Sequence, residues 1–215
     1  AGAQSGNHLA CLVHDAPGDG RLATCTGRVS PRHPEWRFVL RGRAPNIIGS
    51  IEVYETGRET PRQTLSGFDV RPRLVPGDGI APGRVDFVLQ DVNFDRFNDL
   101  RLAVGPPDGD GTAYHWFLFD KDADAFVPTD VLDGLRDPLF NPRRRLISSS
   151  FKDERGRTGR VTYKWRDGKL DASGAFAHER TEDGRCIATH YVMRDGRFEK
   201  KTETECRAGE ELERE

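Results

Sequence analysis

The stretch VDFVLQDVNFDRFNDLRLAV (residues 85–104) decides the fold class of this chain of 215 residues. Apolar side chains take every second position on both sides of an acidic centre, and they are Val85, Phe87, Leu89, Leu100, Leu102 and Val104. Alternation with a period of two is typical of a β-strand that buries one face. The stretch therefore predicts two strands joined by a polar loop.

The acidic centre carries oxygen-bearing side chains at positions 1, 3, 5 and 9 of a loop that begins at residue 91. This spacing lets one tight turn direct several oxygens at a single point, and the main-chain carbonyl of position 7 adds another. Hard oxygen donors suit Ca²⁺ and not a thiophilic metal. We expect a calcium ion that stabilises the fold, with the ligands Asp91, Asn93, Asp95, Phe97 (through its carbonyl) and Asp99.

The sequence of this loop departs from that of a helix–loop–helix calcium site. Strand patterns flank the loop, and position 12 is Leu102 instead of Glu. Position 6 is Arg96 where such loops usually have Gly, so a left-handed backbone there costs about 1 kcal/mol. A polar hairpin turn without an ion is the alternative interpretation.

Repeated hairpins organise the last third of the chain. Asp-Gly turn signals separate alternating stretches. The segment YKWRDGKL (residues 163–170) is echoed as YVMRDGRF (residues 191–198), which indicates repeated β units. We expect an all-β, antiparallel meander in three parts. They are an N-terminal disulfide-bridged β portion (1–71), a Pro/Gly-rich linker (72–82) and a portion with the acidic loop and the hairpins (83–215).

The four cysteines fall as one close pair near each end of the chain. Of the three possible connectivities, this spacing favours the bridges Cys11–Cys25 and Cys186–Cys206. Disulfides indicate an oxidising compartment, and reduced thiols of a cytosolic protein are the alternative. A rival for the first pair is a zinc site that combines it with His8 and His14, although no CxxC pair is present. No signal peptide is visible, so we expect the sequence of a mature secreted form.

Composition and motifs argue against several function classes. The 33 basic and 35 acidic residues give a formal charge of −2, which provides no general attraction to nucleic acid or anionic lipid. No apolar run is long enough for a membrane helix. The six histidines are scattered, and no HExxH, GxSxG, P-loop or GxGxxG motif is present. A second acidic set, Asp120, Asp122 and Asp124, matches only three loop positions and predicts an ordinary turn. We expect a non-enzymatic protein.

Three motifs, in this order, resemble a known family. They are DVNFDRFNDLRL (91–102), YHWFLFDKDADAFV (114–127) and the run from NPRRRLISSS to YKWRDGKL (141–170). The family is that of periplasmic or lipid-anchored bacterial immunity proteins, which xanthomonads and their relatives use against lysozyme-like effectors of an antibacterial type IV secretion system. The first motif alone is shared by many calcium-binding β repeats of the integrin-like type.

This resemblance implies a β-propeller-like fold with some incomplete blades, a Ca²⁺ site on the acidic loop, and inhibition of a secreted peptidoglycan hydrolase in the periplasm. The resemblance also implies that a loop tyrosine plugs the hydrolase cleft. The comparable loop here, FKDERGRTGR (residues 151–160), contains no tyrosine. Its arginines suit the paired carboxylates of a glycosidase cleft. The predicted partner-binding residues are Arg155, Arg157, Thr158 and Arg160.

The alternative function is a Ca²⁺-dependent adhesion or glycan-binding module of the cell surface. An enzyme of unrecognised type is a third interpretation. Stoichiometric inhibition of a lytic enzyme distinguishes the first function from the other two.

Overall fold

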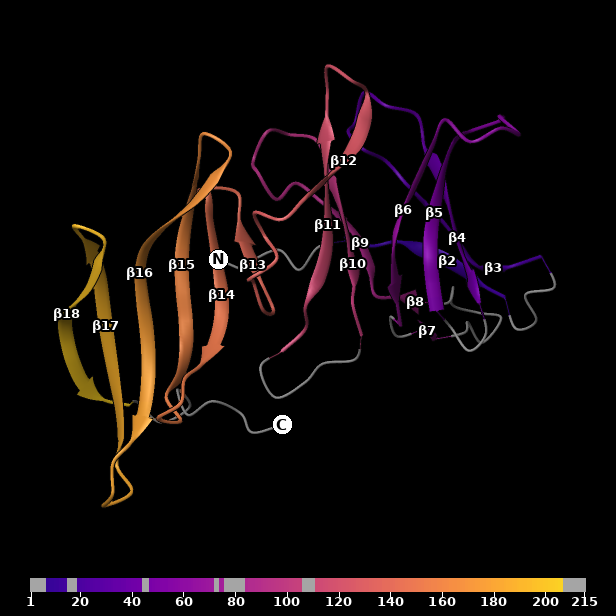
Figure 1. The fold of residues 1–215 in the computed structure, drawn as a ribbon. Coiled ribbons are helices and arrows are strands. Elements are labelled where there is room, and N and C mark those ends of the chain that lie inside the picture. Colours follow the sequence, from indigo (N-terminus) through magenta and orange to yellow (C-terminus); the bar gives the residue numbers. More distant parts are fainter. Residues whose placement is uncertain are drawn as a thin grey trace. The chain divides into compact units, whose positions relative to one another are not determined.

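The computed structural model describes residues 7–14, 19–43, 47–71, 74–75, 84–105 and 111–206. The regular structure of these residues is β-strand throughout, which confirms the all-β, antiparallel fold class. The strands form three antiparallel sheets and a two-stranded ladder (Figure 1). The described residues show no closed barrel and no propeller of the kind that the resemblance implies. They also include no helix that could cross a membrane.

The chain divides into two compact units. The N-terminal unit comprises residues 5–108 and 112–134, and the C-terminal unit is built mainly on residues 135–215. The expected C-terminal portion, residues 83–215, therefore contributes strands to both units. Most of the expected linker lies outside the described residues, and its described part, β7 (Leu74–Val75), pairs with β8 (Arg84–Val85).

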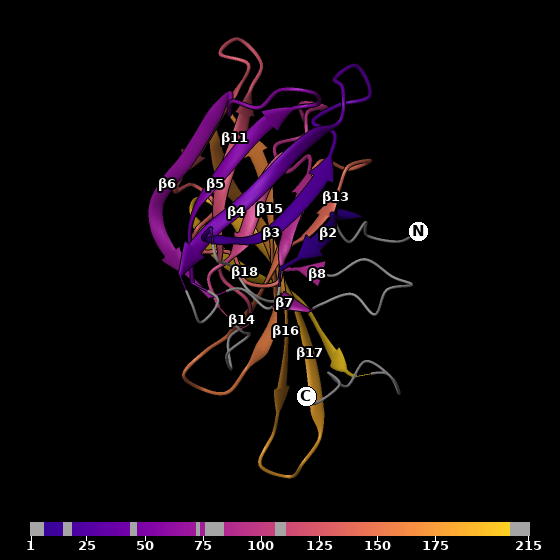
Figure 2. The ribbon, with the colours of Figure 1, turned by 90° about the vertical axis from the view of Figure 1, so that its right-hand side faces the viewer.

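The first sheet of the N-terminal unit is a meander in which each strand pairs with the next, in the order β2-β3-β4-β5-β6. Figure 2 shows its strands side by side. In β4 the alternating residues Trp36, Phe38 and Leu40 are almost completely buried, as the period of two predicts. The strands are β2 (Ala10–Val13), β3 (Arg21–Gly27), β4 (Trp36–Arg43), β5 (Ile47–Glu55) and β6 (Gln63–Val70).

The second sheet of this unit contains the two strands predicted around the acidic centre. Its order is β1-β9-β10-β11-β12, and Leu100 of β10 lies opposite Leu89 of β9. Every residue of β9 and β10 is buried. The strands are β1 (Asn7–His8), β9 (Phe87–Gln90), β10 (Asp99–Ala103), β11 (Tyr114–Asp120) and β12 (Ala125–Thr129).

The two sheets of the N-terminal unit share one hydrophobic core. Phe38 of β4 meets Phe87 of β9 with 5.6 Å between ring centroids, and Trp36 meets Phe126 of β12 at 6.0 Å. Both pairs are edge-to-face, a geometry that adds about 0.5–1.5 kcal/mol to the burial of the rings. The acidic loop is therefore carried by a sandwich whose two layers come from distant parts of the sequence.

The C-terminal sheet is a six-stranded meander in the order β13-β14-β15-β16-β17-β18. Asp167 and Gly168 have φ values of 48° and 74°, and Asp195 and Gly196 have 46° and 75°. Two consecutive left-handed residues define the tight hairpin turns predicted from the Asp-Gly signals. The strands are β13 (Leu139–Asn141), β14 (Leu146–Lys152), β15 (Thr158–Arg166), β16 (Lys169–Arg180), β17 (Cys186–Arg194) and β18 (Arg197–Glu205). All residues of β18 are exposed.

Both predicted disulfides are present. Cys11 and Cys25 face each other in the β2–β3 pair and are buried, whereas Cys186 and Cys206 join the ends of β17 and β18. The zinc alternative is wrong, because the first bridge occupies both of its cysteine sulfurs. His14, another member of that set, lies with its Nε2 atom 3.1 Å from Thr24 Oγ1. The two disulfides fit a protein of an extracytoplasmic compartment.

Replacing Cys11 and Cys25 together by alanine is expected to lower the free energy of unfolding by about 3 kcal/mol. The paired replacement of Cys186 and Cys206 should cost less. The two bridges close loops of similar length, with sequence separations of 14 and 20. The first pair is also packed in the core, and the second is only partly buried. Urea unfolding of both double variants measures the difference, and an equal or larger loss for the second pair would contradict the burial argument.

Candidate functional site

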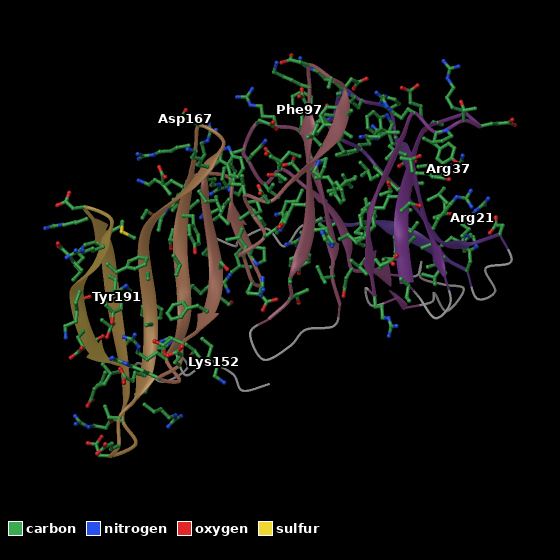
Figure 3. All side chains as sticks on the ribbon, viewed as in Figure 1. Arg21, Arg37, Phe97, Lys152, Asp167 and Tyr191 are labelled. Carbon is green, nitrogen blue, oxygen red and sulfur yellow. A yellow bond between two sulfur atoms is a disulfide. The ribbon has the colours of Figure 1, made fainter. Side chains whose placement is uncertain are left out.

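The acidic loop (residues 91–99) connects β9 to β10, and its apolar side chains fix it to the N-terminal unit. Val92 and Phe94 are buried. Phe97, labelled in Figure 3, stacks on Phe119 of β11 with 5.4 Å between ring centroids. Its ring also packs edge-on against His33 at 5.8 Å. The loop therefore rests on aromatic and aliphatic side chains, while its polar residues lie between these anchors in the sequence.

The polar side chains of the loop accept hydrogen bonds from its own backbone. The two carboxylate oxygens of Asp91 accept from the N–H groups of Asp95, at 3.0 Å, and Arg96, at 2.9 Å. Asn93 Oδ1 accepts from the Asp95 N–H at 3.1 Å, and Asp95 Oδ1 from the Phe97 N–H at 2.8 Å. Asp and Asn commonly shape tight turns in this way.

The backbone is left-handed at two non-glycine positions of the loop. Phe94 has a φ of 64° and Arg96 a φ of 78°. Arg96 occupies the position where calcium loops usually have Gly. The left-handed backbone, which is costly for a residue with a Cβ atom, is the conformation observed there. The hydrogen bond from the Arg96 N–H to Asp91 offsets part of this cost, because it occurs only when the chain turns here.

Asp99 is the last predicted calcium ligand and the most deeply buried, with 1% of its surface exposed. Its Oδ2 accepts from the Val92 N–H at 2.9 Å, and its Oδ1 accepts from the Phe119 N–H at 2.8 Å. The carboxyl group therefore joins the start of the loop to β11. Burial raises the pKa of Asp99 to about 8, and the charges of Asp95 and Asp91 act in the same direction.

The donor set of the loop fits a hard cation in its chemistry. All five predicted donors are oxygens. Burial raises the pKa of Asp91, and the nearby charge of Asp95 raises it as well. A divalent cation would relieve this mutual repulsion. The described residues contain no group of three or more His, Cys, Asp or Glu side chains gathered closely enough to hold a metal ion. Calcium binding by this loop therefore stays a prediction.

The second acidic set forms the ordinary turn that the sequence predicts. Asp120 Oδ1 accepts from the N–H groups of Asp122, at 2.8 Å, and Ala123, at 3.1 Å. Asp124 instead points to Arg62, with 2.6 Å between Oδ2 and Nη2. This turn between β11 and β12 is therefore closed by its own hydrogen bonds and by an ion pair.

The loop between β14 and β15 (residues 153–157) carries two of the predicted partner-binding arginines. Asp153 organises it, because its Oδ1 accepts from the N–H groups of Arg155, at 3.0 Å, and Arg157, at 2.9 Å. Its Oδ2 accepts from Arg157 Nε at 2.7 Å. Arg155 is exposed. Thr158, the third predicted contact, begins β15 opposite Lys152, which Figure 3 labels.

Arg160 is held inside the C-terminal unit. Its Nη2 donates to the carbonyl oxygens of Asp137, at 2.6 Å, and Ser148, at 2.9 Å, and its Nη1 donates to Ser150 Oγ at 2.9 Å. Burial lowers the pKa of its guanidinium from the usual value. The structure thus brings Arg155, Arg157 and Thr158 to one end of the β14–β15 hairpin and directs Arg160 into internal contacts.

Sequence reasoning missed the role of Asp153. A signal was available, because Asp153 stands three residues before Gly156, whose φ is 77°. An Asp that opens a turn and a Gly in left-handed conformation at its end are a common pair. The acid that stands among the arginines therefore shapes the loop that presents them.

Comparison with known proteins places this architecture beside one solved structure, that of a Xanthomonas type IV secretion system related protein. The two share 15% sequence identity with a TM-score of 0.58, and the similarity covers 89% of this chain and 99% of the other. At this identity the likeness shows the fold. No protein-family model and no curated protein matches the chain.

Asp99 is expected to make the stability of the cation-free protein depend on pH. The folded-state pKa is about 8, and an unfolded Asp has a pKa of about 3.9. Between these values the folded state keeps a proton that the unfolded state has lost. The free energy of unfolding should therefore fall as the pH rises from about 4 to 8. Urea unfolding with chelator at several pH values measures this slope.

The matched variants are Asp99→Asn and Asp95→Asn. Asn at position 99 has a single acceptor oxygen for two backbone N–H groups, so this variant should lose about 1–3 kcal/mol and show a shallower pH slope. Asp95→Asn should retain most of the wild-type slope, because burial, and not the charge of Asp95, is the main cause of the raised pKa of Asp99. A slope that is the same in the wild type and in Asp99→Asn would contradict the assignment.

Proposed function

We propose that this protein is a non-enzymatic immunity protein that binds and inhibits a secreted, lysozyme-like peptidoglycan hydrolase in the periplasm. The observation that carries the proposal is the fold shared, over almost the full length of both chains, with a type IV secretion system related protein. Two disulfides support an extracytoplasmic site of action. The motifs that resemble the immunity family lie in the acidic loop, in β11–β12 and in the β14–β15 hairpin.

The β14–β15 loop is the proposed contact region. Arg155 is exposed, and Arg157 has 31% of its side chain accessible, so both guanidinium groups can meet a partner. The cleft of a lysozyme-like hydrolase contains carboxylates. Arginine forms strong, charge-assisted hydrogen bonds with such groups. Thr158 lies at the end of the same loop, whereas the guanidinium of Arg160 is occupied by internal contacts. We therefore assign the contact to Arg155, Arg157 and Thr158.

Calcium has a structural role in this proposal. The ion would be held by Asp91, Asn93, Asp95, the Phe97 carbonyl and Asp99, and it would neutralise the acidic loop. Because Phe97 and Asp99 both contact β11 at Phe119, a fixed loop would also fix this strand of the second sheet. The ion is therefore expected to stabilise the N-terminal unit.

The purified protein is expected to inhibit a lysozyme-like effector stoichiometrically and without turnover. The candidate hydrolases are those whose genes lie beside the gene of this protein and those that it captures from a lysate. Inhibition is measured as slower clearing of a peptidoglycan suspension by the hydrolase. Arg155→Glu should weaken inhibition at least tenfold, because it places a carboxylate against carboxylates. Arg185→Glu, in the exposed β16–β17 turn, is the matched control and should inhibit like the wild type.

A protein that binds no lytic enzyme but binds a glycan or matrix partner in a chelator-sensitive manner would favour the alternative, a Ca²⁺-dependent adhesion module. The acidic loop alone supports that alternative, since such loops occur in many calcium-binding β repeats. The exposed arginines favour inhibition instead.

Calcium at millimolar concentration is expected to raise the melting temperature by several degrees, and chelator should reverse the change. Binding of an ion to the folded state alone stabilises it in proportion to the logarithm of the ion concentration over Kd. The increase should be larger at pH 8 than at pH 5, because protons compete for the carboxylates. Asp91→Asn should reduce the effect, and Asp122→Asn in the second acidic turn should preserve it. Equal responses of both variants would exclude the acidic loop as the site.

A further inference from the structure

A small apolar cavity lies on one face of the C-terminal sheet, beside the β14–β15 loop. Its volume is about 260 Å³. Strand pairing explains its shape, because Ala175 of β16 lies between Val161 of β15 and Tyr191 of β17. Ala177, two residues further along β16, shares this face. The lining residues are Phe151, Arg157, Val161, Ala175, Ala177, Tyr191 and Phe198.

The cavity exists because small side chains form its floor and larger ones form its walls. Each alanine leaves the space that a large side chain would fill at the same position of the sheet. Phe198 stands out in the wall, because it is the single apolar side chain of β18 and 43% of it is exposed. An exposed aromatic ring beside a concave apolar surface is typical of a contact site.

Two hydrogen-bond donors lie at the wall of this apolar space. Arg157 Nη1 lies 3.5 Å from the Tyr191 hydroxyl, and its Nε and Nη2 atoms each lie 2.7 Å from Asp153 Oδ2. Arginine has five N–H donors. These contacts with described residues use three of them. If the Tyr191 hydroxyl oxygen accepts from Arg157, the O–H of Tyr191 can donate to another group. The donors left at this wall are therefore this O–H and two N–H groups of Arg157. The wall therefore suits an apolar group that has an acceptor oxygen attached.

We propose that this cavity receives one large apolar side chain of the protein partner, and that a carboxylate beside that side chain accepts from Arg157 and Tyr191. The volume favours a single side chain, since sites for free small molecules usually measure about 300–1,000 Å³. Buried aromatic side chains that fill a pocket are the common anchors of protein interfaces. This inference rests on the proposed function, because it assigns an anchor to the same partner that the β14–β15 loop contacts.

The test uses the full chain labelled with ¹⁵N and two probes, N-acetyl-tryptophan and N-acetyl-tryptophan amide. Chemical-shift changes are expected at the amides of Ala175, Ala177 and Tyr191, with a Kd on the order of 1 mM for the carboxylate probe. The amide probe, which has no charge, should bind at least threefold more weakly. Shifts that are scattered over the surface, or equal affinities of the two probes, would overturn the proposal.

The variant Ala175→Leu fills the cavity and should weaken binding of the carboxylate probe at least tenfold. Lys164→Leu is the matched control, because Lys164 is exposed on the opposite face of β15 and should bind the probe like the wild type. Phe198→Ser, on the exposed edge strand, provides a second variant and should weaken binding at least threefold. Unchanged affinity in a folded Ala175→Leu or in Phe198→Ser would refute the cavity as the site.

The same variants in the hydrolase assay separate this inference from the proposed function. If the wild type inhibits a hydrolase and Ala175→Leu inhibits it equally well, the anchor is refuted while the function stands. If the probe binds in the cavity but no lytic enzyme is inhibited, the proposed function fails, and with it the assignment of the cavity to that partner. Weaker inhibition by Ala175→Leu, with full inhibition by Lys164→Leu, supports both.

Discussion

The buried carboxyl group of Asp99 is the contact on which the acidic loop depends. It accepts one hydrogen bond from the backbone of the loop and another from the backbone of β11. Both bonds occur in a water-poor setting, where an unpaired N–H group would be costly. The turn between β9 and β10 places this carboxyl group where both of its oxygens accept a hydrogen bond. The bond to β11 anchors the end of the loop that carries Asp91, Asn93 and Asp95.

The period of two was sufficient to predict the strands on both sides of the loop, because β9 and β10 lie in the centre of their sheet and bury their apolar residues. The Asp-Gly pairs at 167–168 and 195–196 predicted their hairpins for a similarly local reason, since both residues of each pair adopt left-handed backbone. The cysteine spacing predicted both bridges. Each of these signals lies within a short stretch of the sequence. Its structural outcome therefore does not depend on how distant parts of the chain pack.

Features that depend on distant parts of the chain were not predictable in this way. Trp36 and Phe38 share a core with Phe87 and Phe126, so the N-terminal strands and the acidic-loop strands form one unit. No pattern near Pro72 indicates that association. The internal role of Arg160 depends on Asp137, far away in sequence, and the alanine-floored cavity depends on the register of five strands. For the acidic loop, the sequence predicts the oxygen donors of the expected ion. The structure shows that backbone N–H groups of the loop donate hydrogen bonds to the four side chains among these donors.

The exposed last strand, β18, has a consequence for the behaviour of the protein at high concentration. One side of this strand has no neighbouring strand within the described sheet, and such an edge offers unpaired backbone groups to any other extended chain. Six of its nine residues are charged, with both signs present. A second molecule that approached in register would bring like charges together and would need to dehydrate lysine and glutamate side chains. The charges of this strand therefore disfavour edge-to-edge pairing with a second molecule.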